Sequence, residues 1–366
     1  MKIVSIVGAR PNFIKLGPLS KQIRKKHNEI IIHTGQHYDH EMSKLLFEEI
    51  GIPSPDYNMG INQGTPTEQI SRMLVEISNI LTNEKPDLTI VYGDTNSTMA
   101  GAVASIQNKI PCAHIEAGPR NNSILINEML NRLIVDRIST LLFCATKSNL
   151  KLLLKEGLGN HSFFVGDHMY DAYLQNIELA KKYKSLLKEH GVTENNYHLA
   201  TCHRAETTDD KQRLQIIINS LKKSEKPVLF SIHPRTEKML KQFNLYKDIK
   251  NIDNIVMTKA MGYLEFLMFG FYANKIITDS GGVQRESFFL DKPCIVIYDE
   301  SGWPDIQKIG WQIVTGLNEQ KIIEAINNYK LPNRPKPNIF GNGDASEKTM
   351  EIIENYNFTD WHRYKI

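Results

Sequence analysis

Short stretches rich in β-branched and apolar residues alternate with longer stretches of helical periodicity along most of the chain. The first series comprises Lys2–Gly8, Glu29–Gly35, Asp87–Asp94, Pro111–Gly118, Leu141–Thr146 and Phe163–Asp167. The second series comprises His198–Arg204, Pro227–Pro234, Ile255–Lys259, Lys275–Gly282, Pro293–Glu300 and Gln312–Gly316. This alternation is typical of βαβ units, in which helices connect parallel strands. The sequence therefore predicts an α/β fold with two doubly wound parallel sheets.

The two series are separated by a helical segment, residues 169–190, which resembles an interdomain connection. We therefore predict a first Rossmann-like domain over residues 1–168 and a second over residues 169–353. A last helical pattern covers residues 345–356, and we expect the C-terminal helix, about residues 354–366, to pack back against the first domain. In such a pair of domains, a ligand is expected between them, at the carboxyl ends of both sheets.

Composition and charge exclude several classes of protein. Among the 366 residues, 41% are hydrophobic and 23% are charged, which suits a chain with a sizeable core. The 44 Lys and Arg residues nearly balance the 41 Asp and Glu residues, so the net charge of +3 is too small for a protein that coats nucleic acid. No basic stripe with interleaved aromatic residues is present either. We expect no nucleic-acid partner.

Cysteine usage and hydropathy predict a cytoplasmic protein. Cys112, Cys144, Cys202 and Cys294 are far apart and form no CxxC pair, which favours reduced thiols over a zinc site or a disulfide framework. The amino terminus is predicted to form a strand rather than an export signal. The most apolar stretch, Phe266–Ala273, is far shorter than the roughly 18 residues of a membrane span, so we expect no membrane partner.

Cations and carboxylates follow the strands of the first predicted domain. Arg10 closes the first strand and Lys15 lies one turn into the next helix, a spacing that fits neutralisation of a phosphate and equally fits solvated cations at a turn. Asp94 ends the third strand, where it could also cap the following helix. Glu116 follows an apolar strand and must be paired or protonated. With Glu128, these acids could divide the steps of a proton transfer.

A glycine-rich turn is the strongest local signal in the second predicted domain. The segment Thr278–Glu286 joins a buried strand to a helix, and the N–H groups of Ser280, Gly281 and Gly282 could hold a diphosphate without a metal ion. Glu286 would then accept both ribose hydroxyls. An ordinary Gly-rich turn with a surface glutamate is the competing interpretation.

Imidazole and guanidinium groups follow two neighbouring strands of the same domain. They lie in His203-Arg204 and His233-Pro234-Arg235. We expect them at the same edge of the sheet as the glycine-rich turn, which is the rim of the predicted site. In the first domain, Gln36 and His37 follow the second strand. For these two residues, ligand contact and a satisfied loop histidine are comparable interpretations.

Several motifs of other enzyme classes are absent from the sequence. There is no DxD pair, no HExxH-type metal spacing, no GxGxxG and no GxxxxGK[ST]. These absences argue against metal-dependent sugar transfer, dinucleotide redox chemistry and P-loop hydrolysis. We expect a nucleoside diphosphate ligand, with no metal and no cofactor.

Five motifs occur in a fixed order along the chain. They are Gly8-Ala9-Arg10-Pro11 with Lys15, Gly93-Asp94-Thr95, His114-Ile115-Glu116-Ala117-Gly118, His203-Arg204-Ala205-Glu206 and Asp279-Ser280-Gly281-Gly282. In this order they resemble the non-hydrolysing UDP-N-acetylglucosamine 2-epimerase family, and Gly341–Ser346 resembles its GxGxAS signature. The resemblance implies a GT-B architecture of two Rossmann-like domains, a homodimer, and UDP held mainly by the second domain.

The resemblance also implies roles for individual residues. The catalytic set would be Arg10, Lys15, Asp94, Glu116, Glu128 and His203. The UDP-binding set would be Phe266, Ser280, Gly281, Gly282 and Glu286, to which their position at the same rim adds His233 and Arg235. In many bacterial members a second UDP-sugar acts as an activator, and it would contact Gln36, His37 and Arg204.

The implied reaction is the reversible epimerisation at C2 of UDP-GlcNAc to UDP-ManNAc, which supplies precursors of surface polysaccharides. In this family UDP leaves as the C2 proton is removed, and a 2-acetamidoglucal intermediate forms. Protonation on the opposite face and re-addition of UDP then give the epimer. Carboxylates would handle the protons and cations would hold the departing UDP.

Three segments depart from the family pattern. The usual AGLR becomes Ala117–Arg120, with a proline at position 119. The usual PEExNR becomes Asn127–Arg132, which keeps Glu128 but lacks the proline and the second acid. The usual RxxTExPE becomes Tyr298–Asp305, which lacks an arginine and an acid at the sugar end. These departures bear on the substrate more than on the type of reaction.

Three other functions are compatible with the sequence. The opening motif and His-Pro-Arg-Thr also resemble family members that act on UDP-2,3-diacetamido-2,3-dideoxyglucuronate. A GT-B glycosyltransferase would share the architecture and the diphosphate turn, but it would need an acceptor. A UDP-sugar-binding protein could have lost turnover through the changes at Pro119 and Tyr298.

Overall fold

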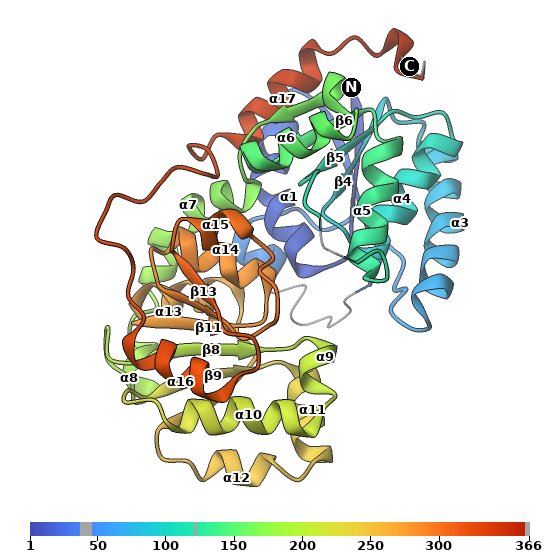
Figure 1. Cartoon of the computed structure of the whole chain (residues 1–366). Helices are drawn as coiled ribbons and strands as arrows, with labels where there is room; N and C mark the ends of the chain where they lie inside the picture. The colour runs from blue at the N-terminus through green and yellow to red at the C-terminus, as the bar shows by residue number, and fades with distance from the viewer. Residues whose placement is uncertain (37–45, 121–122, 363–366) are drawn as a thin grey trace. The chain divides into compact units, whose positions relative to one another are not determined.

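The computed structural model describes residues 1–36, 46–120 and 123–362. Contacts within the chain divide it into two compact units. Unit 1 comprises Met1–Gln175 and Asn338–Ile366, and unit 2 comprises Asn176–Pro337. Each unit contains one parallel sheet with helices packed against it (Figure 1).

The described part of unit 1 contains a sheet of seven strands in the order β3-β2-β1-β4-β5-β6-β7. The strands are β1 (Lys2–Val7), β2 (Asn28–His33), β3 (Tyr57–Asn58), β4 (Leu88–Tyr92), β5 (Cys112–Ile115), β6 (Leu141–Cys144) and β7 (Ser162–Phe164). Neighbouring strands pair in parallel, with Val4 of β1 opposite Ile30 and Thr89. The direction in which the chain adds strands reverses between β1 and β4, which makes this the topological switch point of the sheet.

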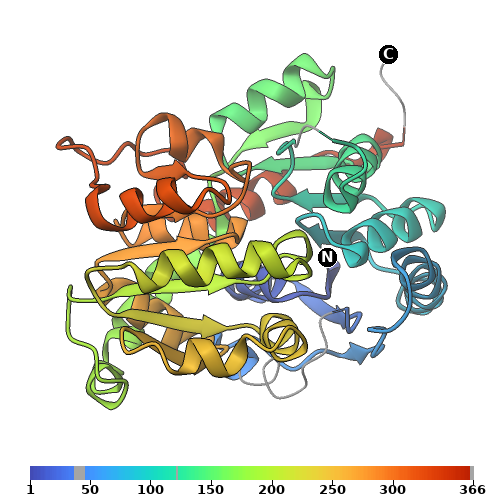
Figure 2. The ribbon, with the colours of Figure 1, turned by 60° about the horizontal axis from the view of Figure 1, so that its bottom comes forward.

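The helices of unit 1 pack against this sheet or against one another. They are α1 (Arg10–Ile23), α3 (Pro66–Glu84), α4 (Asn96–Gln107), α5 (Asn127–Ile138), α6 (Lys147–Lys155), the first part of α7 (His168–Lys181) and α17 (Ala345–Asn355). Helix α3 begins at a capping box, in which Thr65 accepts from the N–H of Glu68. It lies beside α4 (Figure 2), and Met73, Ile77 and Leu81 of α3 enter the core.

Unit 2 repeats this plan with six strands, in the order β10-β9-β8-β11-β12-β13. The strands are β8 (His198–Cys202), β9 (Val228–Ile232), β10 (Ile255–Lys259), β11 (Lys275–Thr278), β12 (Cys294–Val296) and β13 (Gln312–Val314). All of these neighbouring strands pair in parallel. The switch point of this sheet lies between β8 and β11.

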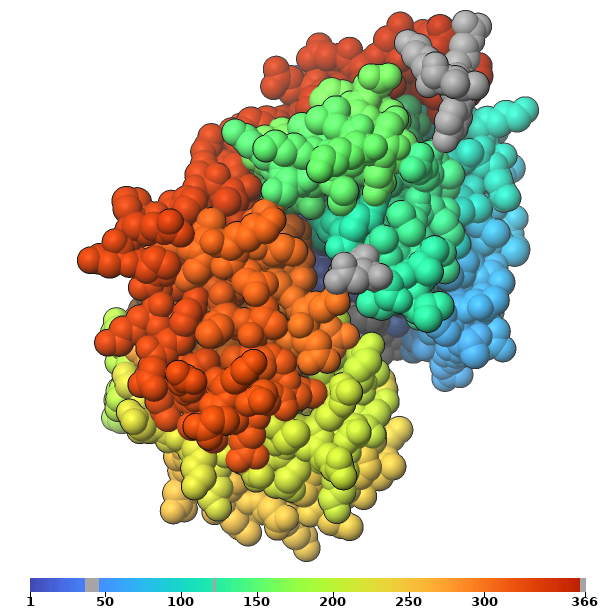
Figure 3. Space-filling view, viewed as in Figure 1, coloured from blue at the N-terminus to red at the C-terminus, as the bar shows by residue number. Residues whose placement is uncertain are grey.

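Helices also surround the sheet of unit 2. They are α8 (Leu186–Glu189), α9 (Ala205–Thr208), α10 (Lys211–Lys222), α11 (Pro234–Gln242), α12 (Tyr246–Lys250), α13 (Tyr263–Tyr272), α14 (Gly281–Phe289), α15 (Pro304–Lys308) and α16 (Glu319–Asn328). In Figure 3 the orange-red part of the surface adjoins the yellow-green part of unit 2. Helices α10 and α16 contact each other. Their inner faces pack Leu214, Ile218 and Ile322 into one cluster with the strands.

Each segment that the sequence predicts as a strand contains one. The strands stop one to four residues earlier than the predicted segments where polar or glycine residues form the following turn, as at Asp94 and Ser280. The edge strand β3 is not predicted, because its two residues, Tyr57 and Asn58, are too few to show an alternating pattern.

The boundaries of the two units differ from those predicted. Unit 1 extends to Gln175 in α7, and the chain enters unit 1 again at Asn338. The carboxylate of Asp171 in α7 accepts from the N–H groups of Ala345 (3.2 Å) and Ser346 (2.7 Å) at the start of α17. The N–H of Asp167 donates to Phe340 at 2.9 Å. These bonds place the start of α7 and the return segment in unit 1. The returning helix is α17, which covers most of the helical pattern predicted for residues 345–356. Of the C-terminal helix expected at about residues 354–366, residues 363–366 lie outside the described part of the chain.

Candidate functional site

The candidate residues collect at the switch point of each sheet. In unit 1, Arg10 follows β1 and Asp94 follows β4. In unit 2, His203 follows β8 and Ser280 follows β11. These pairs of strands flank the switch points described above. Open α/β sheets bind their ligands at the carboxyl ends of these strands, because the loops diverge there and helix N-termini face the gap.

A compact cluster of charges occupies the switch point of unit 1. Lys15 Nζ lies 2.6 Å from Glu116 Oε2, and Arg132 Nη2 lies 2.6 Å from Glu116 Oε1. The same guanidinium binds Asp94, with Nη2 at 2.8 Å from Oδ2. Lys15, Glu116 and Arg132 are all buried. Of the two states that the sequence allowed for Glu116, the structure therefore shows the paired one.

Arg132 is a site residue to which the sequence assigned no role. Burial opposes its charge, but the carboxylates of Asp94 and Glu116 hold the pKa of Arg132 above its ordinary value. Its position could have been noticed, because it lies four residues after Glu128 and therefore on the same face of α5. The residues that it joins are far apart in the chain, and no local pattern shows that they meet.

The backbone at this cluster adopts left-handed conformations. Glu116 has φ +70°, which is unusual for a residue with a side chain, and the N–H groups of Glu116 and Ala117 both donate to Phe143 at 3.0 Å. Gly93 also has φ +70°, and a Cβ there would lie 3.3 Å from Lys15 Nζ. Gly93 therefore provides both the turn and the space for the ammonium group.

Asp94 is not a helix cap. The N-cap of α4 is Thr95, whose hydroxyl accepts from the N–H of Thr98. The Asp94 carboxylate instead binds Arg132, while the side chain of Asn131 donates to its carbonyl at 2.8 Å. The capping alternative raised by the sequence is therefore wrong, because the neighbouring threonine fills that position.

The remaining candidates of unit 1 differ in burial and contacts. Arg10 is the first residue of α1 and is half-buried, while Glu128 is exposed in the first turn of α5. The side-chain oxygen of Gln36 accepts from the N–H of Ser97 at 3.0 Å and from its hydroxyl at 2.8 Å. His37 lies outside the described residues.

In unit 2, the glycine-rich turn starts helix α14. The hydroxyl of Ser280 caps this helix by accepting from Val283. The N–H of Ser280 donates to Thr278 Oγ1 at 2.9 Å, so it is already used within the turn. Gly281 and Gly282 are the first two residues of α14, where N–H groups have no partner within the helix. A Cβ at Gly281 would meet no atom within 4 Å, so the approach to this backbone is open.

A buried aspartate organises the turn that carries His203. The carboxylate of Asp279 accepts from the N–H groups of His203 (2.9 Å) and Arg204 (2.8 Å) and from the Cys202 thiol (3.3 Å). Its carbonyl accepts from Arg204 Nε at 2.8 Å. The guanidinium of Arg204 lies over the ring of Tyr298, 4.2 Å from the centroid. Asp279 is the first residue of the Asp279-Ser280-Gly281-Gly282 motif. Its hydrogen bonds from the end of β11 to the residues after β8 are visible only in the fold.

The other UDP-binding candidates of unit 2 have different environments. The rings of His203 and His233 are 5.4 Å apart, and His233 Nδ1 accepts from the N–H of Arg235. The guanidinium of Arg235 pairs with Asp209 at the surface, with Nε 3.1 Å from Oδ1. Phe266 on α13 and Glu286 on α14 are buried.

Comparison with known proteins gives this geometry a context. A family model described as UDP-N-acetylglucosamine 2-epimerase matches residues 21–354. The chain belongs to this family.

Three relatives of this 2-epimerase are similar to it in sequence over nearly their whole length. A protein of Methanococcus maripaludis described as a UDP-N-acetylglucosamine 2-epimerase homolog is 46% identical over 97% of this chain and 100% of its own. The UDP-2,3-diacetamido-2,3-dideoxy-D-glucuronate 2-epimerase of Pseudomonas aeruginosa is 38% identical over 96% of this chain and 99% of its own. The solved structure of Methanocaldococcus jannaschii UDP-GlcNAc 2-epimerase with UDP-GlcNAc and UDP has a TM-score of 0.91 at 41% identity, covering 97% and 99% of the two chains.

The fold class predicted from the sequence is confirmed by these comparisons. The two Rossmann-like sheets follow the architecture of solved 2-epimerases over nearly the whole chain. Among the described residues, no helix has the length and apolar character needed to cross a bilayer. The same part of the chain contains no group of three or more His, Cys, Asp or Glu side chains placed to hold a metal ion.

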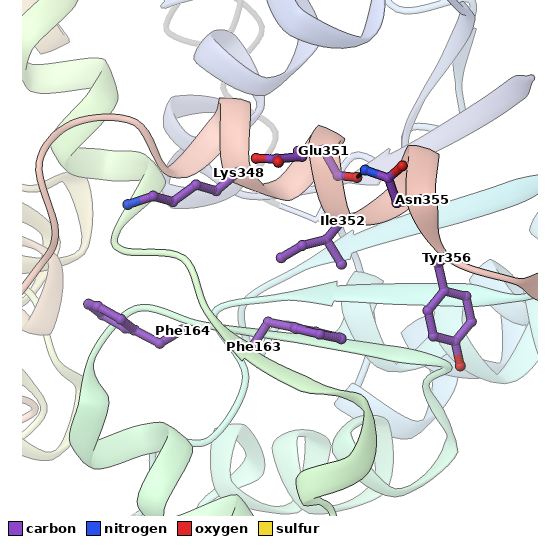
Figure 4. A pocket seen from close by; sticks show the side chains of 7 residues that line it. All are labelled: Phe163, Phe164, Lys348, Glu351, Ile352, Asn355 and Tyr356. Carbon is purple, nitrogen blue, oxygen red and sulfur yellow. Dashed lines mark hydrogen bonds between the residues drawn. The ribbon is translucent and has the colours of Figure 1, made fainter.

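A separate pocket in unit 1 contains none of the candidate residues. It has a volume of about 400 Å³ and lies between α17 and β7 (Figure 4). Ile352 points from α17 toward Phe163, and Lys348 extends along the same side of the helix. The lining is mostly apolar and aromatic, and it lacks the carboxylate pairs of the switch point.

Proposed function

We propose that this 2-epimerase catalyses the reversible interconversion of UDP-GlcNAc and UDP-ManNAc. The observation that carries the proposal is the buried Glu116 carboxylate between Lys15 and Arg132, with Asp94 on the same guanidinium, at the switch point of a Rossmann-like sheet. Membership of the family and the M. jannaschii relative, whose solved structure contains UDP-GlcNAc and UDP, support the choice of substrate.

The chemistry of the sugar explains why acids and cations are needed together. The C2 hydrogen of a 2-acetamido sugar is not next to a carbonyl group, so its removal alone would leave an unstabilised carbanion. In the proposed step, a carboxylate takes the C2 proton, the C1–O bond breaks with its electron pair going to UDP, and a C1–C2 double bond forms. Protonation of C2 on the opposite face and return of UDP to C1 give the epimer.

We assign the proton transfers to unit 1 and nucleotide binding to unit 2. Asp94, Glu116 and Glu128 would handle protons, while Arg10 and Lys15 would stabilise the departing diphosphate. In unit 2, the start of α14 at Gly281 and Gly282 would bind phosphate, because its N–H groups have no helical acceptor. Glu286 would accept the ribose hydroxyls, His203 would belong to the catalytic set, and Phe266, His233 and Arg235 would complete nucleotide binding. Gln36, His37 and Arg204 would contact an activating UDP-sugar.

A second substrate is supported by one specific relative. The P. aeruginosa protein named for UDP-2,3-diacetamido-2,3-dideoxy-D-glucuronate is 38% identical over almost the whole chain. Its sugar carries a carboxylate that UDP-GlcNAc lacks. The reaction type would be the same for both substrates, since each has a hydrogen at C2 and UDP at C1.

Isotope exchange distinguishes these possibilities. The purified chain is incubated in D2O with UDP-GlcNAc alone, and the C2 position is followed by NMR. Deuterium at C2 together with UDP-ManNAc supports the proposal, whereas free UDP with ManNAc would indicate a hydrolysing enzyme. Exchange only with the diacetamido-uronate would change the substrate and keep the mechanism. Tight UDP binding without exchange in either sugar would refute the epimerase.

We also propose that the protein is a cytoplasmic homodimer that supplies precursors of surface polysaccharides. All four cysteines are buried free thiols, which suits a reducing compartment. The dimer is checked by light scattering coupled to size exclusion, and a monomer mass at micromolar concentration would contradict it.

A further inference from the structure

A buried histidine next to the charge cluster has a hydrogen-bond acceptor at each ring nitrogen. His114 lies in β5 and is fully buried. Its Nε2 lies 2.6 Å from the carbonyl oxygen of Gly93, and its Nδ1 lies 2.7 Å from Asp136 Oδ1. A carbonyl oxygen can only accept, so Nε2 must carry a hydrogen.

The partner at Nδ1 is an ionised carboxylate. Burial alone would raise the pKa of Asp136, but hydrogen bonds and charges from His114 and Arg120 hold it below its ordinary value. Its second oxygen accepts from Arg120 Nη1 at 2.7 Å and from the N–H of Gly118 at 3.1 Å. The Arg120 guanidinium and the N–H of Gly118 stabilise the ionised form of this carboxylate, so its Oδ1 can only accept, and Nδ1 of His114 must donate to it. A neutral imidazole has only one N–H.

We propose that His114 carries a hydrogen on each ring nitrogen and thereby positions Asp94, a role that rests on the function proposed above. Strand β5 holds both backbone groups of Gly93. The N–H of Gly93 donates to the carbonyl of Ile115 at 2.9 Å, and the carbonyl of Gly93 accepts from His114. Asp94 follows directly, and its carboxylate is thereby directed to Arg132. This histidine is a positioning residue, because none of its atoms belongs to the proposed proton path.

Titratable groups near Asp136 keep one protonation state near neutral pH. Four other titratable side chains have charges that interact with that of Asp136, namely Arg120, Arg132, Cys144 and His161. The two arginines are fixed cations, and burial raises the pKa of the Cys144 thiol. Burial also lowers the pKa of His161, so this imidazole is neutral at pH 7.

Two other histidines of the chain serve as neutral references. Burial lowers the pKa of His33 to about 4, and its Nδ1 accepts from the N–H of Gly35 at 2.8 Å. This ring therefore has one nitrogen without hydrogen. Burial lowers the pKa of His198 to about 3. One NMR spectrum of the chain should thus contain both neutral and cationic buried rings.

The proton count is measured directly with the full chain labelled with ¹⁵N in histidine. We expect both ring nitrogens of His114 to carry hydrogen, because each faces an acceptor, while His33 keeps one bare nitrogen, because its Nδ1 accepts from Gly35. A His114 ring with a single proton at neutral pH would overturn the proposal. This measurement needs no substrate, so it can fail or succeed independently of the proposed epimerase activity.

Two variants test the positioning role. In His114→Gln both N–H groups belong to one nitrogen, which cannot replace Nδ1 and Nε2 at the same time. The variant should lower kcat about 10- to 100-fold with little change in KM, because small displacements of a catalytic group are costly. Asp136→Asn should convert His114 to a ring with one proton and lower kcat as well. It also keeps the test informative if His114→Gln does not fold.

The control is His27→Gln, a partly buried histidine of unit 1 that pairs with Glu354. It should leave kcat, KM and the spectrum of His114 unchanged. If Asp136→Asn leaves the proton count of His114 at two, or if His114→Gln retains full kcat, the positioning role is wrong.

Discussion

Replacing Glu116 by glutamine tests the centre of the proposed mechanism. The substitution keeps the size of the side chain and removes the charge that Lys15 and Arg132 share at 2.6 Å each. A glutamine amide is a very weak base, so it cannot accept the C2 proton. Since a general acid or base contributes about 10²- to 10⁴-fold, we expect C2 exchange to fall by about 10³-fold.

The same substitution also has a cost in stability. Lys15 is buried, and without Glu116 its ammonium loses a partner, which typically costs about 3–5 kcal/mol. Glu29→Gln is a matched control, because Glu29 is equally buried and accepts from Ser5 at 2.8 Å and from Arg24 at 2.8 Å. It should lower stability but leave exchange per folded molecule unchanged.

Three measurements are made on both variants. Deuterium incorporation at C2 is followed in D2O, UDP affinity by calorimetry, and the folded fraction by denaturant titration. UDP affinity should change little in Glu116→Gln, because nucleotide binding is assigned to unit 2. Exchange within about tenfold of the native rate would refute the assignment of Glu116. An equal loss in Glu29→Gln would show that the effect comes from stability alone.

Three further predictions concern other parts of the chain. Glu286→Ala should weaken UDP binding about 10- to 100-fold, since charged hydrogen bonds to the ribose are lost, and unchanged affinity in calorimetry would remove Glu286 from the site. Asp171→Ala should destabilise the start of α17 by about 1–3 kcal/mol, because two N–H groups lose a buried acceptor; hydrogen exchange over residues 345–355 should then be faster than in the native chain. Burial lowers the pKa of His198 to about 3, so only the unfolded chain binds this proton between about pH 6.5 and 3. Stability should therefore fall as pH falls through that range, by at most about 1.4 kcal/mol per pH unit from this group, and His198→Leu should flatten the slope measured by urea unfolding.

Much of the fold and part of the site could be predicted from local patterns. Short apolar runs that end in polar or glycine residues predict parallel strands, because each run is buried on both faces and its end must return to water. The order of these runs then places Arg10, Asp94, His203 and Ser280 at strand ends. The motif around Gly281 likewise predicted a helix start with open N–H groups.

The pairing of charges was decided only by the tertiary structure. The sequence left Asp94 between a helix cap and a catalytic acid, and its contact with Arg132, 38 residues later, excluded the cap. His114 meets Asp136 across 22 residues, and Asp279 reaches His203 across 76 residues. Electrostatic and hydrogen-bond energies depend on distances in space. The sequence by itself therefore determined the strands, the helices and the family, and the packing of the strands decided which acid faces which cation.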